Sequence, residues 1–268
     1  MGTPSFAWDP EKYVQFGDFR SRPFFDLTSR VVAHAPRRVV DLGCGPGNLT
    51  ATLAQRWPDA IVTGLDSSPA MIAMAHANLA AQGSAPLATL NFEIADISGW
   101  APTQDTEVVV SNAALQWVPG HQQLMAGWLA ALRPGAWLAV QVPGNFTSPS
   151  HVLMRELAES PRWRGRLGGV LRHDHAVAEP ADYHRIMLDG GARADVWTTT
   201  YQQLLTGPDP VLNWVRGTGL RPVLDVLDAE ETVEFEADYS GLLKEAYPAT
   251  PHGTPFPFRR IFMVGQKI

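Results

Sequence analysis

Three glycines, Gly43, Gly45 and Gly47, alternate with other residues directly after an apolar run. Glycine lets a backbone turn tightly and approach a ligand without a clash at Cβ. The third glycine of a dinucleotide-binding fingerprint would fall at Asn48, so that fingerprint is not met. The carboxylate of Asp41, just before the glycines, can accept hydrogen bonds from a ligand ammonium group or from the loop's backbone N–H groups, but it would repel a pyrophosphate. The segment therefore predicts a binding loop for a ligand that carries an amine.

Polar side chains also end the next predicted strands. Asp66 ends the second apolar run, where a carboxylate can take both hydroxyls of a ribose; alternatively it, Ser67 or Ser68 caps the helix that follows. Asp96 ends the third run and can accept from an adenine amino group, or be a solvated loop residue. Asn112 ends the fourth run. Because ligands of open α/β sheets bind outside the carboxyl ends of the strands, we expect these side chains to face one crevice.

The elements that must position these residues alternate between strands and helices. Short β-rich runs are predicted at residues 38–42, 61–66, 90–94, 107–111, 136–142, 194–200 and 260–265. Helical patterns lie at 48–57, 69–81, 121–132 and 181–188. Repeated strand–helix units indicate a parallel sheet, whose buried strands read as unbroken apolar runs. The predicted fold is α/β: a Rossmann-like, doubly wound, mostly parallel seven-stranded sheet.

The expected domain organisation is a single domain of 268 residues. A helix at about residues 10–32 precedes a cofactor-binding core at 38–143. Proline, glycine and histidine become frequent after Gly144. Residues 145–180 and 202–257 are then helical insertions at the carboxyl edge of the sheet, where large insertions usually build a substrate lid.

Composition and charge exclude several functional classes. Lys plus Arg number 21 against 27 Asp plus Glu, a net charge of −6, which disfavours a nucleic acid partner. No apolar run approaches the roughly 20 residues of a spanning helix, so no membrane association is expected. The first ten residues lack the basic cluster and apolar core of a signal peptide, and Cys44 is the single cysteine. These features favour a reducing cytoplasm.

Three segments together resemble one family of enzymes. Residues 41–47 (Asp-Leu-Gly-Cys-Gly-Pro-Gly) resemble motif I of the class I S-adenosylmethionine-dependent methyltransferases, 64–71 their second-strand motif and 95–97 their third. The resemblance implies S-adenosylmethionine as cofactor, with the glycine loop around the methionine end, the second-strand acid on the ribose and the third-strand acid on the adenine amine. It also implies that Met71 packs on the adenine ring. The other cofactor-binding residues that we predict are Arg22 (on the methionine carboxylate), Ser67, Ile97, Asn112 and Trp117.

A narrower resemblance, to the trans-aconitate 2-methyltransferases, extends over almost the whole chain. It rests on residues 8–13, 20–23, 111–119, 149–156, 195–201, 219–222 and 258–262. The family implies methyl ester formation on a carboxylate of trans-aconitate, a small polycarboxylic acid. This sequence departs from the family in a longer Arg- and His-rich stretch at 162–175, which can alter the substrate pocket.

A carboxylate acceptor needs cations rather than a base. A carboxyl group in water has a pKa of about 4, so it is ionised at pH 7 and no catalytic residue is predicted; positioning and electrostatics suffice. Arginine is favoured because its fork makes two parallel bonds to one carboxylate. We expect Arg221 and Arg260 in this role, with Arg259 turned outward by strand alternation. The remaining predicted substrate-binding residues are Gln116, Asn145, Tyr201 and Trp214.

Other interpretations stay open at this point. The acceptor can be another small acid, an amine or a phenol, and the chain can instead be a non-catalytic S-adenosylmethionine-binding domain. No metal site is predicted, because His173 and His175 flank Asp174 in a polar stretch that reads as a solvated loop. A nicotinamide dehydrogenase is disfavoured by Asp41 and Asn48. The sequence makes no prediction of oligomeric state.

Overall fold

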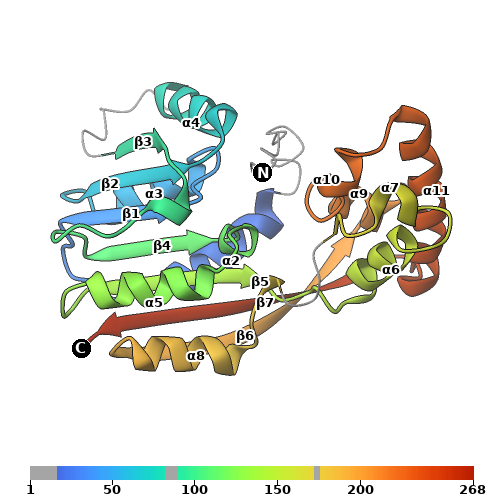
Figure 1. Ribbon diagram of the computed structural model, residues 1–268. Helices are drawn as coiled ribbons and strands as arrows, with labels where there is room; N and C mark the ends of the chain where they lie inside the picture. Colours follow the sequence, from blue (N-terminus) through green and yellow to red (C-terminus); the bar gives the residue numbers. More distant parts are fainter. Residues whose placement is uncertain (1–16, 82–89, 172–175) are drawn as a thin grey trace. The chain divides into compact units, whose positions relative to one another are not determined.

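A seven-stranded sheet organises the part of the chain that this computed structural model describes, residues 17–81, 90–171 and 176–268 (Figure 1). The strands are β1 (Arg38–Leu42), β2 (Ile61–Asp66), β3 (Leu90–Ile94), β4 (Val108–Asn112), β5 (Trp137–Pro143), β6 (Ala192–Leu205) and β7 (Thr254–Lys267). Their order is β3-β2-β1-β4-β5-β7-β6. Strands β1 to β5 pair in parallel, and β7 pairs antiparallel to β5. The predicted Rossmann-like, mostly parallel seven-stranded sheet is confirmed.

The chain divides into two compact units. The first, here called the sheet unit, comprises the described residues up to Pro143 together with Val177–Thr199 and Arg260–Ile268. The second, the helical unit, comprises the described residues of Gly144–Ala176 and Thr200–Arg259. Strands β6 and β7 contribute residues to both units.

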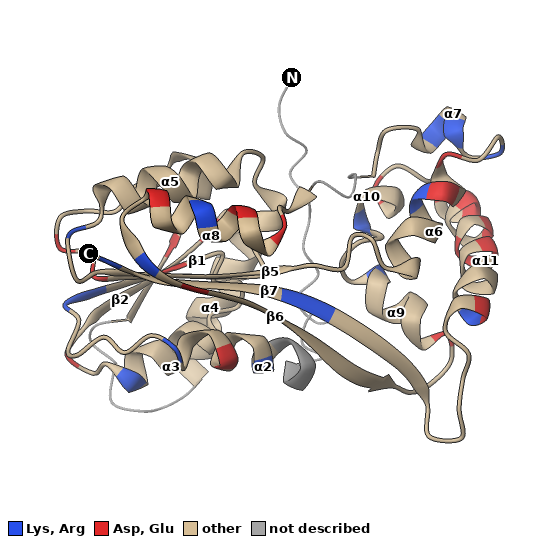
Figure 2. Ribbon diagram, turned by 90° about the horizontal axis from the view of Figure 1, so that it is seen from below, with Lys and Arg blue, Asp and Glu red and all other residues tan. Residues whose placement is uncertain are grey.

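Helices cover both faces of the sheet in the sheet unit. They are α2 (Gly17–Thr28), α3 (Asn48–Arg56), α4 (Pro69–Ala81), α5 (His121–Ala131) and α8 (Pro180–Asp189), with the short helices η1 (Ile97–Gly99) and η2 (Leu115–Trp117). Figure 2 shows α5 and α8 on one face and α2 and α3 on the other. The bounds of α3, α4 and α5 lie within one residue of the predicted patterns. Proline at the first position of α4 and of α8 marks these starts, because its fixed φ suits a helix N-terminus.

The main apolar cluster lies between the sheet and helices α5 and α8. Met125 and Leu129 of α5 and Met187 of α8 are buried against strand residues such as Leu42 and Val140. Each such side chain contributes about 1.5–3 kcal/mol of burial free energy. This cluster fixes the strands whose carboxyl ends carry the predicted site.

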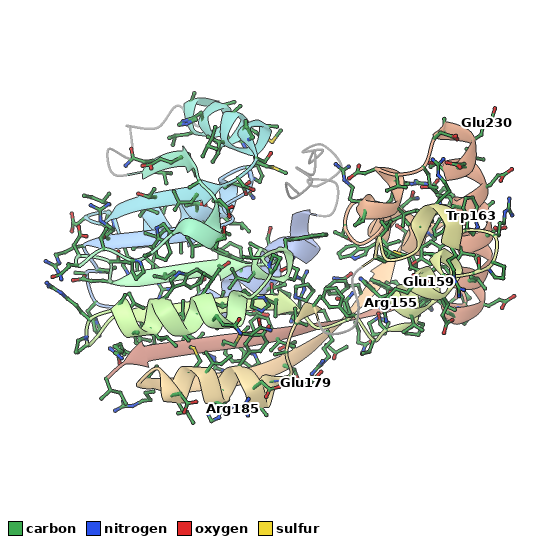
Figure 3. All side chains as sticks on the ribbon, in the orientation of Figure 1. Arg155, Glu159, Trp163, Glu179, Arg185 and Glu230 are labelled. Atoms are coloured by element: carbon green, nitrogen blue, oxygen red, sulfur yellow. The ribbon has the colours of Figure 1, made fainter. Side chains whose placement is uncertain are left out.

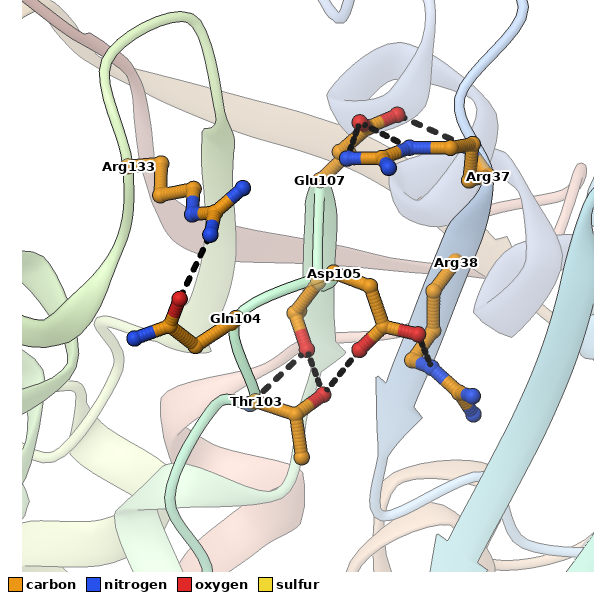
Figure 4. A network of polar contacts seen from close by, with 8 residues as sticks. Arg37, Arg38, Thr103, Gln104, Asp105, Glu107 and Arg133 are labelled. Carbon is orange, nitrogen blue, oxygen red and sulfur yellow. Dashed lines mark hydrogen bonds and ion pairs between the residues drawn. The ribbon is translucent and has the colours of Figure 1, made fainter.

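A polar network ties β1 to β4 at the opposite, amino ends of the strands (Figure 4). The Arg37 guanidinium bonds the Glu107 carboxylate at 2.7 Å, and Arg38 Nε donates to Asp105 at 2.9 Å. The Thr103 hydroxyl also donates to Asp105, at 2.6 Å. The Thr103 and Arg38 hydrogen bonds lower the pKa of Asp105 to about 2. The network fastens these two strands at the ends opposite to those that carry the predicted site residues.

The helical unit is built on α6 (Pro149–Ala158), α7 (Arg164–Leu167), α9 (Pro210–Arg216), α10 (Arg221–Leu224) and α11 (Ala229–Ala246). Asp228 and Glu231 form a capping box that starts α11. Trp163, labelled in Figure 3, packs edge-on against Phe235 of α11 at 5.3 Å. From α6, Arg155 donates to the Phe146 carbonyl at 2.8 Å.

The last two strands are longer than the sequence patterns predicted. Residues 202–205 and 254–257, expected in a lid insertion, form the end of β6 and the start of β7. Within the expected helix at 10–32, the described helix α2 spans Gly17–Thr28. No helix of the described residues is long and apolar enough to cross a membrane.

Candidate active site

The three glycines of the loop after β1 all have positive φ, but they differ in what surrounds them. A Cβ on Gly43 would lie 2.2 Å from the Ala114 Cβ, and one on Gly47 would lie 2.5 Å from the Phe92 ring. A Cβ on Gly45 would meet no atom of the described residues within 4 Å. Gly43 and Gly47 are thus required by packing, whereas Gly45 borders open space that a ligand can fill.

The loop is held by the end of β2. Leu65 O accepts from Gly43 N at 2.7 Å and from Cys44 N at 3.0 Å, and Asp66 Oδ2 accepts from Gly45 N at 3.0 Å. Burial raises the pKa of the Cys44 thiol, with Asp41 and Asp66 adding to the shift. A thiol held in its protonated form is a poor nucleophile, which leaves Cys44 a packing role.

Asp41 is a buried acid, 3% exposed, whose Oδ2 accepts from the Thr50 hydroxyl at 2.6 Å. Burial raises its pKa to about 7, against the lowering effect of the Thr50 bond. Two roles were predicted for Asp41: binding a ligand ammonium group and accepting from backbone N–H groups of the loop. In the structure the Gly45 N–H donates to Asp66, and those of Gly43 and Cys44 donate to Leu65 O. Asp41 points to Thr50 of α3, because the chain turns away at Gly43. Its role toward a ligand ammonium group stays a prediction.

Asp66 is half-buried at the end of β2. Besides Gly45 N, it accepts from Ser68 N through Oδ1 at 2.9 Å, and burial raises its pKa. The cap of α4 is Ser68, whose hydroxyl accepts from Met71 N at 3.4 Å, while Ser67 is exposed. Each carboxylate oxygen accepts about two hydrogen bonds, so Asp66 retains capacity for ribose hydroxyls.

The predicted adenine contacts lie after β3 and on α4. Strand β3 ends at Ile94, so Asp96 stands two residues beyond the strand rather than at its end. It is exposed, and its Oδ1 accepts from Ser98 N at 2.9 Å as the cap of η1. Ile97 and Met71 are buried. Asp96 has one oxygen engaged, and the adenine contact stays a prediction.

The segment after β4 lies against the glycine loop and is strained. Ala113 has φ +56°, a conformation that costs a non-glycine residue about 1–3 kcal/mol. Its N–H donates to Gln141 O at 2.9 Å, and its carbonyl accepts from Gln116 Nε2 at 2.6 Å. Asn112 Oδ1 is buried without a hydrogen-bond partner in the described chain. Backbone strain and unsatisfied buried polar atoms both occur preferentially at functional sites, so this turn stays a candidate for ligand binding.

The contacts of the turn after β4 continue to Gln141 of β5 and, through Gln141, to Arg260 of β7. Arg260 is 5% exposed, and its Nη1 donates to Gln141 Oε1 at 3.3 Å. Arg259 is half-buried and donates to the Gly144 carbonyl, so the two arginines alternate as predicted. The sequence analysis did not predict Gln141 as a site residue. The signal that could have revealed it is its position as the one uncharged polar residue in the apolar run at 137–143.

The remaining predicted acceptor residues belong to the helical unit. Asn145 is buried, with Nδ2 3.4 Å from His151 Nδ1. Tyr201 is buried on β6, and Arg221 is half-buried in the first turn of α10. Trp214 is 1% exposed and packs at 5.5 Å from Phe258, within an aromatic core. These aromatic contacts account for the burial of Trp214. Its predicted place in the wall of the acceptor pocket stays a prediction.

The last two predicted residues to be placed are Arg22 and Trp117. Arg22 is exposed on α2, where it lies 3.8 Å from Asp26. Trp117 ends η2 and is half-buried. His173 and His175 lie outside the described residues. Within the described ranges, no group of three or more His, Cys, Asp or Glu side chains is placed to hold a metal ion.

The sheet unit therefore brings most of the predicted residues together at one edge. Contacts run from Asp66 to the glycine loop, from Gly43 to Ala114, and through Gln141 to Arg260. This edge is formed by the carboxyl ends of the parallel strands, where α/β sheets bind ligands. It offers open space at Gly45, carboxylates on one side and a guanidinium on the other.

Known proteins resemble this chain in sequence and in fold. A family model described as a methyltransferase domain matches residues 39–135. A trans-aconitate 2-methyltransferase from Streptomyces avermitilis is 54% identical over 97% of both chains, and one from Rhodococcus jostii is 52% identical over 97% of this chain and 99% of its own. The fold is similar to that of a phosphoethanolamine N-methyltransferase from Haemonchus contortus in complex with S-adenosylhomocysteine (TM-score 0.53, 14% identity, 92% of this chain and 53% of that chain). The chain belongs to the family of the trans-aconitate 2-methyltransferases.

Proposed function

We propose that this enzyme transfers the methyl group of S-adenosylmethionine to a carboxylate of trans-aconitate, giving a monomethyl ester. The observation that carries the proposal is the 54% identity to a trans-aconitate 2-methyltransferase over nearly the full length of both chains. The acceptor is then a small polycarboxylic acid. A net charge of −6 is compatible with an anionic acceptor only where a local cation offsets it, and the buried Arg260 is such a cation.

The donor site consists of residues that fit each part of the cofactor. The open space at Gly45 accommodates the methionine end, and Asp66 has acceptor capacity for the ribose hydroxyls. The unpartnered Asn112 Oδ1 and the Asp41 carboxylate suit a cationic ammonium group. Asp96 and Ile97 serve the adenine. The other donor contacts in this proposal are Arg22, Gly43, Gly47, Ser67, Met71 and Trp117.

The chemistry asks little of the protein beyond positioning. S-adenosylmethionine supplies a methyl group activated by a positively charged sulfur. A carboxylate oxygen uses a lone pair to form the new O–CH₃ bond while the S–CH₃ bond breaks onto sulfur, and no proton moves. The residues need to hold that oxygen about 3 Å from the methyl carbon and exclude water.

Neither Cys44 nor His121 is available as a base, which agrees with this chemistry. The Cys44 thiol is held protonated, and His121 is engaged with the Tyr183 hydroxyl at 2.7 Å in the core. Arg260 and Arg221 are the proposed acceptor cations, with Gln116, Asn145 and Tyr201 as polar contacts. We retain residues 145–180 and 206–253 as the proposed lid, because residues 202–205 and 254–257 belong to β6 and β7. The single cysteine favours a reducing, cytoplasmic compartment.

A panel of acceptors tests the proposal. The enzyme is incubated with S-adenosylmethionine and each of several di- and tricarboxylates, amines and phenols, and S-adenosylhomocysteine release is measured by chromatography. We expect trans-aconitate to give the highest kcat/KM and amines and phenols to give none. Turnover of an amine or a phenol with no ester from any carboxylate would overturn the proposal.

A further inference from the structure

The side chain of Gln141 is fully buried on β5, with 0% of its surface exposed. Its Nε2 has no hydrogen-bond partner among the residues that the structure describes. A buried amide nitrogen brings two N–H donors out of water, and leaving them unpaired is destabilising. Such unpaired donors in a folded protein need a reason, and ligand binding is one.

The orientation of the Gln141 amide follows from its neighbour. Arg260 Nη1 donates to Gln141 Oε1 at 3.3 Å. Because a guanidinium has only donors, the oxygen of the amide must face Arg260 and the Nε2 group must point elsewhere. The unpaired N–H donors and the buried cation therefore sit side by side.

The neighbouring strand β4 does not supply an acceptor for the Gln141 Nε2 group. Asn112 is the Cα partner of Gln141 across β4 and β5, so both side chains leave the same face of the sheet. Asn112 Oδ1 is an acceptor and Gln141 Nε2 a donor, yet each is unpaired. Both stand near the carboxyl ends of their strands, where a ligand of this fold binds.

The chemistry of the pair suits a carboxylate. The Gln141 Nε2 group offers two N–H donors and the guanidinium has five, so a carboxylate can share its two oxygens between the two side chains. Resting on the proposed function, we infer that Gln141 and Arg260 together bind a carboxylate of the acceptor that is retained, and not the one that is methylated. Gln141 is then an acceptor-binding residue that determines specificity for acids with a second carboxylate.

The reacting carboxylate is excluded from this pair on energetic grounds. A carboxylate that gains a methyl group loses its negative charge as the new bond forms. A cation and two donors on that group would stabilise it more before reaction than in the transition state, and would slow transfer. They would also occupy the lone pairs that must attack. A retained carboxylate keeps its charge throughout, so binding it orients the acceptor without that penalty.

Three dicarboxylates, each lacking a different carboxylate of trans-aconitate, make the test. They are glutaconate, mesaconate and itaconate. Steady-state kinetics are compared for wild type, Gln141→Met and the control Gln203→Met, which changes another buried strand glutamine with an unpaired amide oxygen. We expect Gln141→Met to raise the KM for trans-aconitate tenfold to a hundredfold, on the order of one hydrogen bond to a charged group. Its kcat and its affinity for S-adenosylmethionine should change little.

The dicarboxylates then decide which carboxylate is held. For one of them the Gln141→Met penalty should vanish, and wild type should still methylate that dicarboxylate. Equal penalties on all three, no penalty on trans-aconitate, or a penalty shared by Gln203→Met would overturn the inference. If wild type never methylates one of the dicarboxylates, and the Gln141→Met penalty persists on the two that it does methylate, Gln141 holds the reacting group and the inference is wrong.

A second variant guards against loss of folding. Gln141→Glu keeps the shape and places a carboxylate against Arg260, so the internal ion pair should replace the ligand and raise the KM at least as far. An unchanged KM in this variant would contradict the inference. Failure of the proposed function is distinct, because wild type would then form no ester from any of these acids.

Discussion

Asp41→Asn is expected to stabilise the ligand-free protein while impairing its function. Asp41 is 3% exposed, and burial raises its pKa from 3.8 to about 7. In the unfolded chain the same carboxyl ionises near pH 4. Between these two values the unfolded state releases a proton that the folded state keeps, so folding becomes less favourable as pH rises. Asparagine has the same shape and no such titration.

The size of the effect follows from the pKa difference. A shift of about 3 units is worth about 4 kcal/mol at most when the whole window from pH 4 to pH 7 is crossed. Between pH 5 and pH 8 the window covers about 2 units, or about 3 kcal/mol. The Thr50 hydroxyl can still donate to an amide oxygen at position 41, so the variant loses no internal hydrogen bond.

Urea unfolding of the two proteins at pH 5, 6, 7 and 8 measures this difference. The free energy of unfolding of wild type should fall relative to that of Asp41→Asn as pH rises, with the difference levelling above pH 7. The variant should bind S-adenosylmethionine at least tenfold more weakly, since a charge-assisted hydrogen bond contributes about 1.5–3 kcal/mol. Parallel stability curves from pH 5 to pH 8 would refute the raised pKa of Asp41.

Three further substitutions probe the two halves of the site. Asp66→Ala should weaken S-adenosylmethionine binding by about 1.5–3 kcal/mol, because ribose hydroxyls lose a charged acceptor; unchanged calorimetric affinity would remove the ribose role. Asp96→Asn should cost less, since one hydrogen bond is altered, and a wild type that accepts the inosine analogue equally well would argue against the adenine contact. Arg260→Lys should lower kcat/KM for the acceptor, with a loss of transition-state stabilisation of about 2–4 kcal/mol, and should spare donor binding. The reason is that the point charge of lysine does not replace the two parallel hydrogen bonds of the guanidinium fork. Equal losses for donor and acceptor would assign Arg260 a structural role.

The central strands of the sheet could be predicted from the sequence because they are buried on both faces. Strands β1 and β2 match the predicted runs residue for residue, since such strands read as apolar segments bounded by glycine, proline or acids. Strand β3, at the edge of the sheet, also matches its predicted run, although only Leu90 and Phe92 of it are buried. Strand β7 was predicted too short. Its start carries Pro255 and Pro257, which argue against a strand, yet both are exposed and alternate with the buried Phe256 and Phe258.

The site was predicted in outline, and its internal contacts were not. The loop glycines and Asp66 follow a spacing with a physical reason, so they could be named. Whether Asp41 or Asp66 fastens the loop depends on which carboxylate reaches Gly45 N, and that is a tertiary hydrogen bond. The role that we propose for Gln141 depends on its contact with Arg260, which is 119 residues away in the sequence. Pattern reasoning cannot pair residues at that distance.

The pH dependence of methyl transfer to trans-aconitate tests the central claim most directly. Single-turnover rates are measured with ¹³C-methyl-labelled S-adenosylmethionine between pH 6.5 and pH 9, and the product is identified by NMR. Because a carboxylate with a pKa near 4 is already ionised, we predict one methyl ester signal and a nearly flat rate across this range. A rate that climbs about tenfold per pH unit, with no ester signal, would mean that a proton must be removed before transfer, and would contradict carboxylate methylation.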